Sequence, residues 1–131
     1  MMNQITPEEI RSRLQKKIGA GQAIIVGSVG SGLSAKVEAM AGVDLLLACS
    51  EGRFRMDGHA SSMSLLANGD CNSITKRLLA EVLKVCQGVP VLAGVGCSDP
   101  HKDIALLLED YRKLGISGVA HTPSVGNLVG S

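Results

Sequence analysis

Apolar residues follow two alternating patterns along the chain, short unbroken runs and longer stretches with helical spacing. The short runs are rich in Leu, Val and Ile, which is typical of strands buried in a parallel sheet. They cover residues 23–26, 43–49, 91–95 and 116–120. The longer stretches repeat apolar residues three and four positions apart, which predicts amphipathic helices. These helices cover residues 7–19, 33–41 and 74–86, with a further helix that ends at Gly115.

Residues that favour helix starts stand at the borders of these stretches. Thr6, Pro7 and Glu9 form a capping-box pattern at the beginning of the first helix. Asp70 and Asp99 each come before a predicted helix, where an aspartate typically caps the first backbone amides. We therefore expect helix starts after both aspartates.

The order of the elements predicts an α/β fold. Strands and helices alternate after the first helix, which favours right-handed βαβ crossovers and a parallel sheet. We interpret residues 1–131 as a single domain in which a helix at 7–19 precedes four βα units. No closing helix is predicted after the fourth strand, so we expect the N-terminal half of a (βα)8 TIM barrel. Its two unpaired sheet edges favour a homo-oligomer.

Composition and charge exclude several classes of protein. Of the 131 residues, 45% are hydrophobic and 19% are charged, as in globular domains. A net charge of +1 predicts neither a nucleic-acid nor a membrane partner. No apolar run approaches the roughly 20 residues that span a bilayer, and the first residues do not resemble a secretory signal. The four cysteines have no CxxC or metal-ligand spacing, so we expect unpaired thiols and a cytoplasmic location.

The connection after the second strand is unusually long. Residues 50–70 form it, whereas βα loops usually contain about 2–6 residues. Because loops after parallel strands line the ligand-binding face of α/β proteins, this segment indicates the position of a site. In an extended segment Arg53 and Arg55 would point the same way and clamp an acid. The alternative is a solvated lid whose charges pair with one another.

A glycine-rich turn joins the first strand to the next helix. Gly30, Gly32, Leu33 and Ser34 lie where the amides of a helix N-terminus can bind a carboxylate or phosphate. The turn matches neither the P-loop nor the dinucleotide-binding fingerprint, because its glycines run GxxGxG and no Gly-Lys-Ser/Thr follows. The alternative is a tight turn that requires glycine conformations.

Two residues are candidates for acid–base chemistry. Asp70 closes the long loop, and His121 ends the fourth strand, so both are expected at the carboxyl end of the sheet. For Asp70 the alternative is the capping role alone. His101 is interpreted as a surface residue. The sequence gives no Ser/His/Asp set and no metal cluster.

Seven short motifs stand in a fixed order along the chain. They are residues 32–36 (GLSAK), 52–56 (GRFRM), 69–72 (GDCN), 90–95 (PVLAGV), 99–100 (DP), 118–119 (GV) and 123–126 (PSVG). Together they resemble the phosphoenolpyruvate hydrolase-like family of TIM-barrel proteins over residues 4–131. The family is itself distantly similar to the phosphoenolpyruvate mutase and isocitrate lyase superfamily. Residues 49–51 depart from the family, with Cys-Ser-Glu in place of a usual Tyr-Asn-Ser.

The resemblance implies a chemistry that the residues match only in part. The superfamily cleaves or rearranges C–C and C–P bonds of small 2-oxoacids with magnesium. It places residues 32–35 beside the substrate carboxylate and matches Asp70 to an aspartate before the second barrel helix. Its acidic magnesium ligands fall at Ala93, Gly94 and near His121, so we assign no metal ligand and expect magnesium to bind weakly at most.

The leading hypothesis is an enzyme of the hydrolase or lyase type, or a protein derived from one, that acts on a small phosphorylated or carboxylated 2-oxoacid. The glycine-rich turn and the two arginines would bind the anion, and Asp70 or His121 would serve as acid or base. One alternative is a non-catalytic ligand-sensing or partner-binding barrel domain. Another is a truncated half-barrel that does not function alone.

Overall fold

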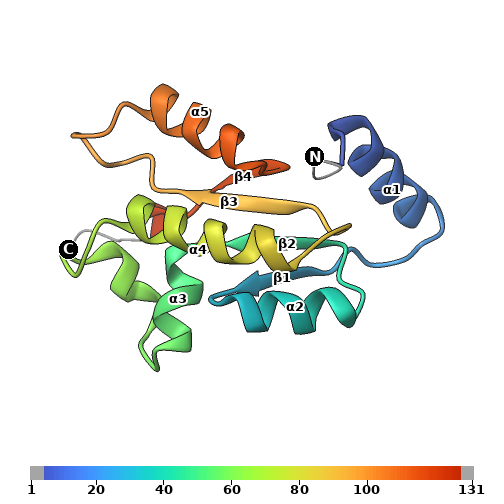
Figure 1. The fold of residues 1–131 in the computed structure, drawn as a ribbon, viewed down its shortest axis with the longest axis horizontal. Coiled ribbons are helices and arrows are strands. Elements are labelled where there is room, and N and C mark those ends of the chain that lie inside the picture. The colour runs from blue at the N-terminus through green and yellow to red at the C-terminus, as the bar shows by residue number, and fades with distance from the viewer. Residues whose placement is uncertain (1–4, 128–131) are drawn as a thin grey trace.

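The computed structural model describes residues 5–127, so the first and last four residues of the domain predicted for 1–131 lie outside it (Figure 1). The strands are β1 (Val26–Val29), β2 (Leu45–Ala48), β3 (Val91–Val95) and β4 (Gly118–His121). The helices are α1 (Pro7–Gly19), α2 (Gly32–Met40), α3 (Ser50–Met56), α4 (Cys71–Val85) and α5 (Ile104–Leu114). Two short 3₁₀ helices, η1 (Ser61–Leu65) and η2 (Val125–Asn127), complete the elements.

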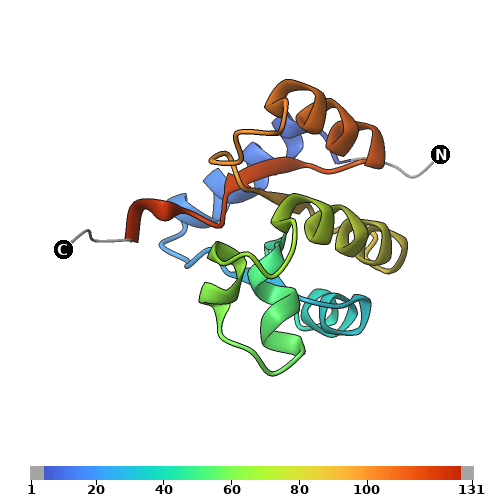
Figure 2. The ribbon, with the colours of Figure 1, turned by 90° about the vertical axis from the view of Figure 1, so that its left-hand side faces the viewer.

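The strands form one parallel sheet in the order β1-β2-β3-β4. Ser28 of β1 pairs with Leu47 of β2, which pairs with Leu92 of β3, which in turn pairs with Gly118 of β4. Helices α2, α4 and α5 lie side by side along one face of this sheet (Figure 2). The structure therefore confirms the predicted N-terminal half of a TIM barrel, with parallel strands inside and helices outside.

The two faces of the sheet differ in composition because side chains alternate along each strand. Leu46, Val91 and Ala93 point toward the helices and are buried against α4, in an aliphatic core that also contains Leu78 and Leu79. The opposite face corresponds to the interior of a barrel and is called the interior face below. It carries Ser28, Leu47, Leu92 and Ala120 together with the glycines that pair with them. Only its carboxyl end is polar.

The first strand lies further along the chain than predicted. It begins at Val26, whereas the pattern predicted residues 23–26. The preceding residue, Ile25, is tied to the next strand instead, because its amide donates to Asp44 Oδ2 at 2.8 Å and its carbonyl accepts from the Asp44 amide. Gly27 lies inside the strand, and the carboxylate of Glu38 on α2 packs close to its Cα. Because Val-Gly-Ser-Val contains a glycine and a serine, its pairing with β2 rather than local propensity fixes this strand.

Two further predictions are wrong in detail. The segment after β2 is not an extended loop, since Ser50–Met56 forms α3 and Ser61–Leu65 forms η1. Helix α5 is capped by Asp103, which accepts from the Leu106 amide at 3.1 Å, and not by Asp99. Asp99 instead accepts from the His101 amide at 2.9 Å and forms a turn ahead of the helix. In contrast, Asp70 caps α4 as predicted.

Helix α1 lies at the amino ends of the strands, opposite to α3 (Figure 1). It buries no residue fully and is held by polar contacts. Lys17 forms an ion pair with Asp44 at 2.7 Å, and Arg13 donates to the Gly88 carbonyl at 3.2 Å. A groove of about 900 Å³ remains between α1 and the ends of α4 and α5. This groove therefore lies at the amino ends of the strands, away from their carboxyl ends.

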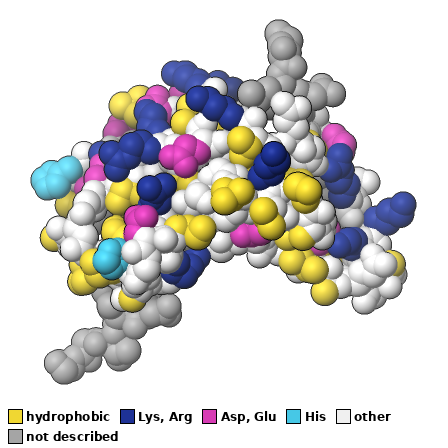
Figure 3. Space-filling view, turned by 60° about the horizontal axis from the view of Figure 1, so that its bottom comes forward, with side chains coloured by type: hydrophobic (Ala, Val, Ile, Leu, Met, Phe, Trp, Pro, Cys, Tyr) yellow, Lys and Arg dark blue, Asp and Glu magenta, His cyan; other side chains and the backbone are white. Residues whose placement is uncertain are grey.

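Several apolar side chains are exposed along the outer side of α2. Leu33, Val37 and Met40 are 74%, 57% and 79% exposed and follow one another at helical spacing. Hydrophobic side chains also reach the surface among basic ones on the side of the molecule that bears α2 (Figure 3). At the other edge of the sheet, Val119 of β4 is 49% exposed. Both edges thus expose apolar side chains that a continued barrel would cover.

The remaining general predictions concern membranes and cysteines. None of the helices between residues 5 and 127 combines the length and apolar character that crossing a bilayer requires. All four cysteines are unpaired, as predicted. Cys49 and Cys86 are buried as small apolar side chains, and burial raises the pKa of both thiols.

Candidate functional site

Five polar side chains meet at the carboxyl end of the interior face. They come from the ends of β1, β2 and β4 and from α3, and we call them the strand-end cluster. Its members are Ser28, Cys49, Glu51, Arg55 and Thr122. Since β3 contributes only Gly94 here, where a Cβ would collide with Cys49 and Thr122, the cluster closes over β3 and spans all four strands.

Arg55 is held in place by two hydroxyl groups. Its guanidinium donates to Ser28 Oγ at 2.6 Å and to Ser61 Oγ at 2.7 Å. In the part of the chain that the structure describes, no carboxylate lies within ion-pair distance of it. A guanidinium offers five N–H donors, so most of its donors remain for a ligand. The arrangement is that of a positioned cation without a counter-ion.

Arg53 lies on a different side of the same helix. It forms ion pairs with Asp57 at 3.5 Å and with Glu81 of α4 at 3.9 Å. The two arginines do not converge, because residues two positions apart on a helix face different directions. The predicted clamp required an extended segment. Because the segment is a helix, Arg53 and Arg55 point in different directions. Only Arg55 reaches the strand-end cluster.

Glu51 connects α3 to the end of β4. Its carboxylate accepts a short hydrogen bond from the Thr122 hydroxyl, and Ser50 Oγ donates to its other oxygen at 3.4 Å. Ser50 is fully buried and is itself hydrogen-bonded to Ser64 at 2.9 Å. The carboxylate is therefore fixed from both sides.

Two glycines allow α3 to approach the sheet. A Cβ on Gly30 would collide with the Gly52 carbonyl, and a Cβ on Gly52 would collide with the Val29 carbonyl. Both residues are consequently restricted to glycine by backbone-to-backbone contact, which explains part of the glycine-rich turn without a ligand. This contact places α3, and with it Arg55 and Glu51, over the strand ends.

The glycine-rich turn is partly satisfied by its own helix cap. The amides of Gly30 and Ser31 donate to Ser34 Oγ at 3.3 and 3.2 Å, and the Ser34 amide donates to Ser31 Oγ. Among residues 5–127, no acceptor is found for the amides of Gly32 and Leu33. Of the turn predicted to bind an anion, these two amides are the donors that remain free.

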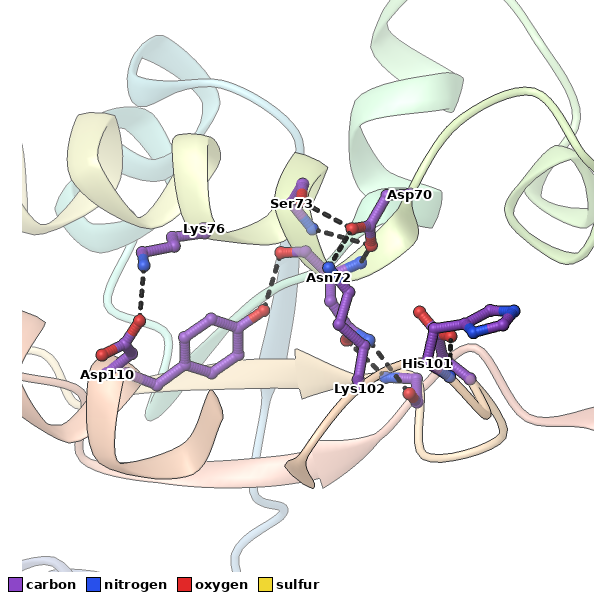
Figure 4. Close-up of polar contacts among 10 residues, drawn as sticks. Asp70, Asn72, Ser73, Lys76, His101, Lys102 and Asp110 are labelled. Carbon is purple, nitrogen blue, oxygen red and sulfur yellow. Dashed lines mark hydrogen bonds and ion pairs between the residues drawn. The ribbon is translucent and has the colours of Figure 1, made fainter. Parts of the chain in front are cut away.

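Asp70 belongs to a second polar network, at the start of α4 (Figure 4). Its carboxylate accepts from the Asn72 and Ser73 amides at 3.0 and 3.1 Å and from Ser73 Oγ at 2.7 Å. Lys102, on the loop before α5, forms an ion pair with it at 2.6 Å. Every part of this carboxylate is engaged in capping the helix and tying it to the neighbouring loop.

The charge state of Asp70 follows from these partners. Partial burial on its own raises its pKa, but the hydrogen bonds from Lys102 and Ser73 outweigh burial and bring the pKa to about 2. The same pair raises the pKa of Lys102. At neutral pH the carboxylate is ionised and weakly basic, so it cannot donate a proton and is a poor proton acceptor.

The network continues into the core through Asn72. This side chain is 1% exposed, accepts from the Gly96 amide at 2.8 Å and donates to the Gly96 carbonyl at 3.0 Å. The backbone carbonyl of Asn72 accepts from the Tyr111 hydroxyl at 2.8 Å, and burial raises the pKa of that hydroxyl. We call Asp70, Asn72, Lys102 and Tyr111 the α4 network. It joins α4, the loop after β3, and α5.

His121 lies at the exposed end of β4. It pairs in register with Val95, which is buried on the helix side of the sheet. Since Thr122, the next residue, belongs to the interior face, alternation places His121 on the opposite face. The structure thus does not bring His121, Asp70 and Arg55 together.

The residues present do not fit a magnesium site. No group of three His, Cys, Asp or Glu side chains gathers anywhere within residues 5–127. Asp70 is neutralised by Lys102, and Glu51 is the single carboxylate of the strand-end cluster. Because magnesium prefers several oxygen ligands, these side chains do not suit it.

Of the strand-end cluster, the sequence predicts a binding role for Arg55 alone. Ser28 lies beyond the residues predicted as the first strand, 23–26, and Thr122 lies beyond those predicted as the fourth, 116–120. Glu51 lies in the long connection at residues 50–70, where the sequence predicts no role for it. The departure of residues 49–51 from the family pattern was the signal that marked this position.

Comparisons with known proteins agree with this architecture. The chain matches the family model described as phosphoenolpyruvate hydrolase-like over residues 9–131. It is 40% identical over 117 residues to the ToMV resistance protein Tm-1(GCR237) of Solanum lycopersicum, covering 89% of this chain. It spans only 16% of that relative's length.

Part of each of several solved structures has the same fold as this chain. A phosphonopyruvate hydrolase in complex with oxalate and Mg²⁺ aligns with a TM-score of 0.63 at 14% identity, over 95% of this chain and 43% of that one. A phosphoenolpyruvate phosphomutase from Streptomyces platensis subsp. rosaceus aligns with a TM-score of 0.61 at 17% identity, over 92% and 42% of the two chains. At these identities the likeness shows the fold alone.

Proposed function

Since the chain belongs to the phosphoenolpyruvate hydrolase-like family, we propose that it binds a small phosphorylated or carboxylated acid at the carboxyl ends of its strands, with Arg55 as the anion-binding residue. The observation that carries the proposal is a guanidinium fixed by the hydroxyls of Ser28 and Ser61 and left without a carboxylate partner among the described residues. Bidentate pairing with a carboxylate or phosphate uses donors of this geometry.

The glycine-rich turn supplies a second set of donors in the proposal. Gly32 and Leu33 have free amides at the start of α2, next to the segment that packs on α3. Gly30 and Ser34 shape this turn, since their contacts are already made within the protein. Arg53 is assigned a structural role between α3 and α4.

The experiment compares two arginines of one helix. Arg55→Gln removes the proposed anion receptor, and Arg53→Gln removes the same charge from a side chain that pairs with Asp57 and Glu81. We expect phosphate, phosphoenolpyruvate and oxaloacetate to raise the melting temperature of the wild type and of Arg53→Gln. Arg55→Gln should lose the shift. Equal responses of both variants, or no shift in the wild type, would contradict the proposal.

The positions of the two acid–base candidates favour binding without catalysis over an enzymatic role. Asp70 is held ionised by Lys102, and His121 is on the other face of the sheet from Arg55. The roles predicted for both in catalysis remain predictions that this geometry does not support. Phosphorus NMR of phosphoenolpyruvate with the protein and magnesium separates the candidates. We expect an unchanged spectrum, whereas conversion to phosphate or a phosphonate would favour the enzyme.

We further propose that a second half-barrel covers the open edges, in a homo-oligomer of this chain. The support is the exposed apolar stripe of Leu33, Val37 and Met40 at one edge and exposed Val119 at the other. Sedimentation over a concentration series should show reversible association that Val37→Lys weakens. A single monomeric species at all concentrations would contradict this proposal.

A further inference from the structure

Two opposite charges stand one turn apart on the same side of α3 without forming an ion pair. Glu51 and Arg55 have the spacing at which a glutamate and an arginine on a helix normally interact. In the part of the chain described, however, they are not within ion-pair distance of each other. The sequence spacing alone would favour a surface salt bridge, so their separation needs a cause.

Hydroxyl groups of the strand ends hold the two charges apart. Ser28, at the end of β1, draws the guanidinium of Arg55 to one side, with a hydrogen bond of 2.6 Å. Thr122, after β4, holds the Glu51 carboxylate toward the β4 edge of the sheet. Cys49 lies between them, with its thiol 3.8 Å from Ser28 Oγ, and its burial raises the pKa of the thiol and keeps it uncharged. The cluster is therefore positive at the β1 end and negative at the β4 end.

Such a pair of charges favours a ligand that carries a second polar group besides its acid group. With the acid group of a ligand on Arg55, the Glu51 carboxylate, whose oxygens only accept hydrogen bonds, would lie on the other side of the ligand, beside Thr122. A keto oxygen in that place is also an acceptor, so it would repel the carboxylate and leave it without a donor. A hydroxyl or ammonium group would donate to it.

We infer that the strand-end cluster is specific for small carboxylic acids that bear a hydrogen-bond donor on the carbon next to the carboxylate, and that Glu51 is the specificity-determining residue. The inference rests on the proposed function, because Arg55 must first bind the acid. It narrows the ligand class from acids in general to 2-hydroxy or 2-amino acids. The hydroxyl and ammonium groups share the donor chemistry that the carboxylate requires.

The test uses three acids with one carbon skeleton. Lactate, alanine and pyruvate differ only in the group on the second carbon, and their dissociation constants for the full-length protein are measured by calorimetric titration. We expect lactate or alanine to bind at least about tenfold more tightly than pyruvate, the effect of one unmade hydrogen bond to a charged group. The difference between lactate and alanine distinguishes a hydroxyl from an ammonium ligand.

Glu51→Gln is the decisive variant. A glutamine keeps one carbonyl oxygen that can accept from Thr122, while its NH2 group replaces the other oxygen and can donate to Ser50 Oγ or to a keto oxygen. In this variant the dissociation constant of pyruvate, divided by that of the tighter of lactate and alanine, should fall to about one. Glu109→Gln changes the same charge on α5, where its partner is Arg112, and should keep the preference.

The possible results distinguish the role of Glu51 in specificity from the role of Arg55 in binding the acid. Pyruvate that binds as tightly as lactate and alanine in the wild type, or a preference that Glu51→Gln leaves intact, overturns the role of Glu51. If Arg55→Gln still abolishes binding in that case, the proposed function stands. Absence of binding for all three acids and for phosphate overturns both.

Discussion

The α4 network and the strand-end cluster lie at the same end of the sheet, yet their polar groups are used in different ways. In the α4 network each charge meets its opposite, as Lys102 meets Asp70 at 2.6 Å, and the buried amide of Asn72 is bonded to both polar groups of the Gly96 backbone. In the strand-end cluster Arg55 and Glu51 are held by neutral hydroxyls and not by each other. The first network closes on itself, whereas the second leaves charge available.

This difference indicates that the α4 network stabilises the half-barrel and that the strand-end cluster is available to a ligand. A buried polar group costs free energy unless it is paired, so the α4 network must be complete for α4 and α5 to pack. An exposed guanidinium costs little when unpaired, so Arg55 can keep donors for a ligand. Mutations in the first region should thus affect folding, and mutations in the second should affect ligand affinity.

The largest effect on stability is expected for Asn72→Ala. The substitution leaves the buried amide and carbonyl of Gly96 without partners, which should lower the free energy of unfolding by about 2–3 kcal/mol. Chemical denaturation measures it. Asn68→Ala, which removes an exposed amide bonded to the Met63 carbonyl, is the control and should change stability by less than about 0.5 kcal/mol. Similar values for both variants would mean that the α4 network is not a structural element.

A smaller effect is expected from acid titration of Asp70. Its pKa is about 2 in the folded chain and 3.8 as the ordinary value, so the unfolded chain binds the proton first as pH falls. The stabilisation is complete above pH 5 and is lost as pH falls through the folded pKa. After allowance for solvent screening it amounts to about 1 kcal/mol.

Denaturation at pH 5 and pH 2.5 tests this sign. Asp70→Asn should lose less stability than the wild type over this range, because its amide does not titrate. Asp57→Asn on α3 makes the same charge change outside the α4 network and should behave like the wild type. A variant at position 70 that is as acid-sensitive as the wild type would show that the ion pair with Lys102 contributes nothing.

The smallest effect on stability is expected for Ser28→Ala. Ser28 is exposed, so removal of its hydroxyl should change the free energy of unfolding by less than about 0.5 kcal/mol. The guanidinium of Arg55 would then lose one of its two anchors, and affinity for phosphate should fall about threefold to tenfold. Ser73→Ala, which removes a hydroxyl that donates to Asp70 of the α4 network, should leave phosphate affinity unchanged. If Ser73→Ala weakened phosphate binding and Ser28→Ala did not, the assignment of the ligand site to the strand-end cluster would be wrong.

The sequence predicts the fold well because patterns repeat and are local. The apolar spacing from Ile74 to Cys86 and the cap at Asp70 identify α4, and the run at residues 91–95 matches β3. Strand β1 is less predictable because its sequence, Val-Gly-Ser-Val, contains a glycine and a serine and is fixed by pairing with β2. Packing between distant segments leaves no local pattern.

The candidate site is less predictable for the same reason. Arg53 and Arg55 are equivalent in a loop, and only the helix between residues 50 and 56 assigns one to Glu81 and the other to Ser28. The hydrogen bond between Glu51 and Thr122 joins residues 71 positions apart. Neither contact can be inferred from the spacing of residue types along the chain.

Mapping of a bound anion by NMR tests the central claim most directly, because both regions are observed in one titration. Phosphate is added to the ¹⁵N-labelled protein and the shift of each backbone amide is followed. We expect saturable shifts at residues 28–33, 49–56 and 121–122, and none at residues 70–73 and 96–102. Shifts confined to the second group, around Asp70 and Lys102, would contradict the assignment of the strand-end cluster as the ligand site.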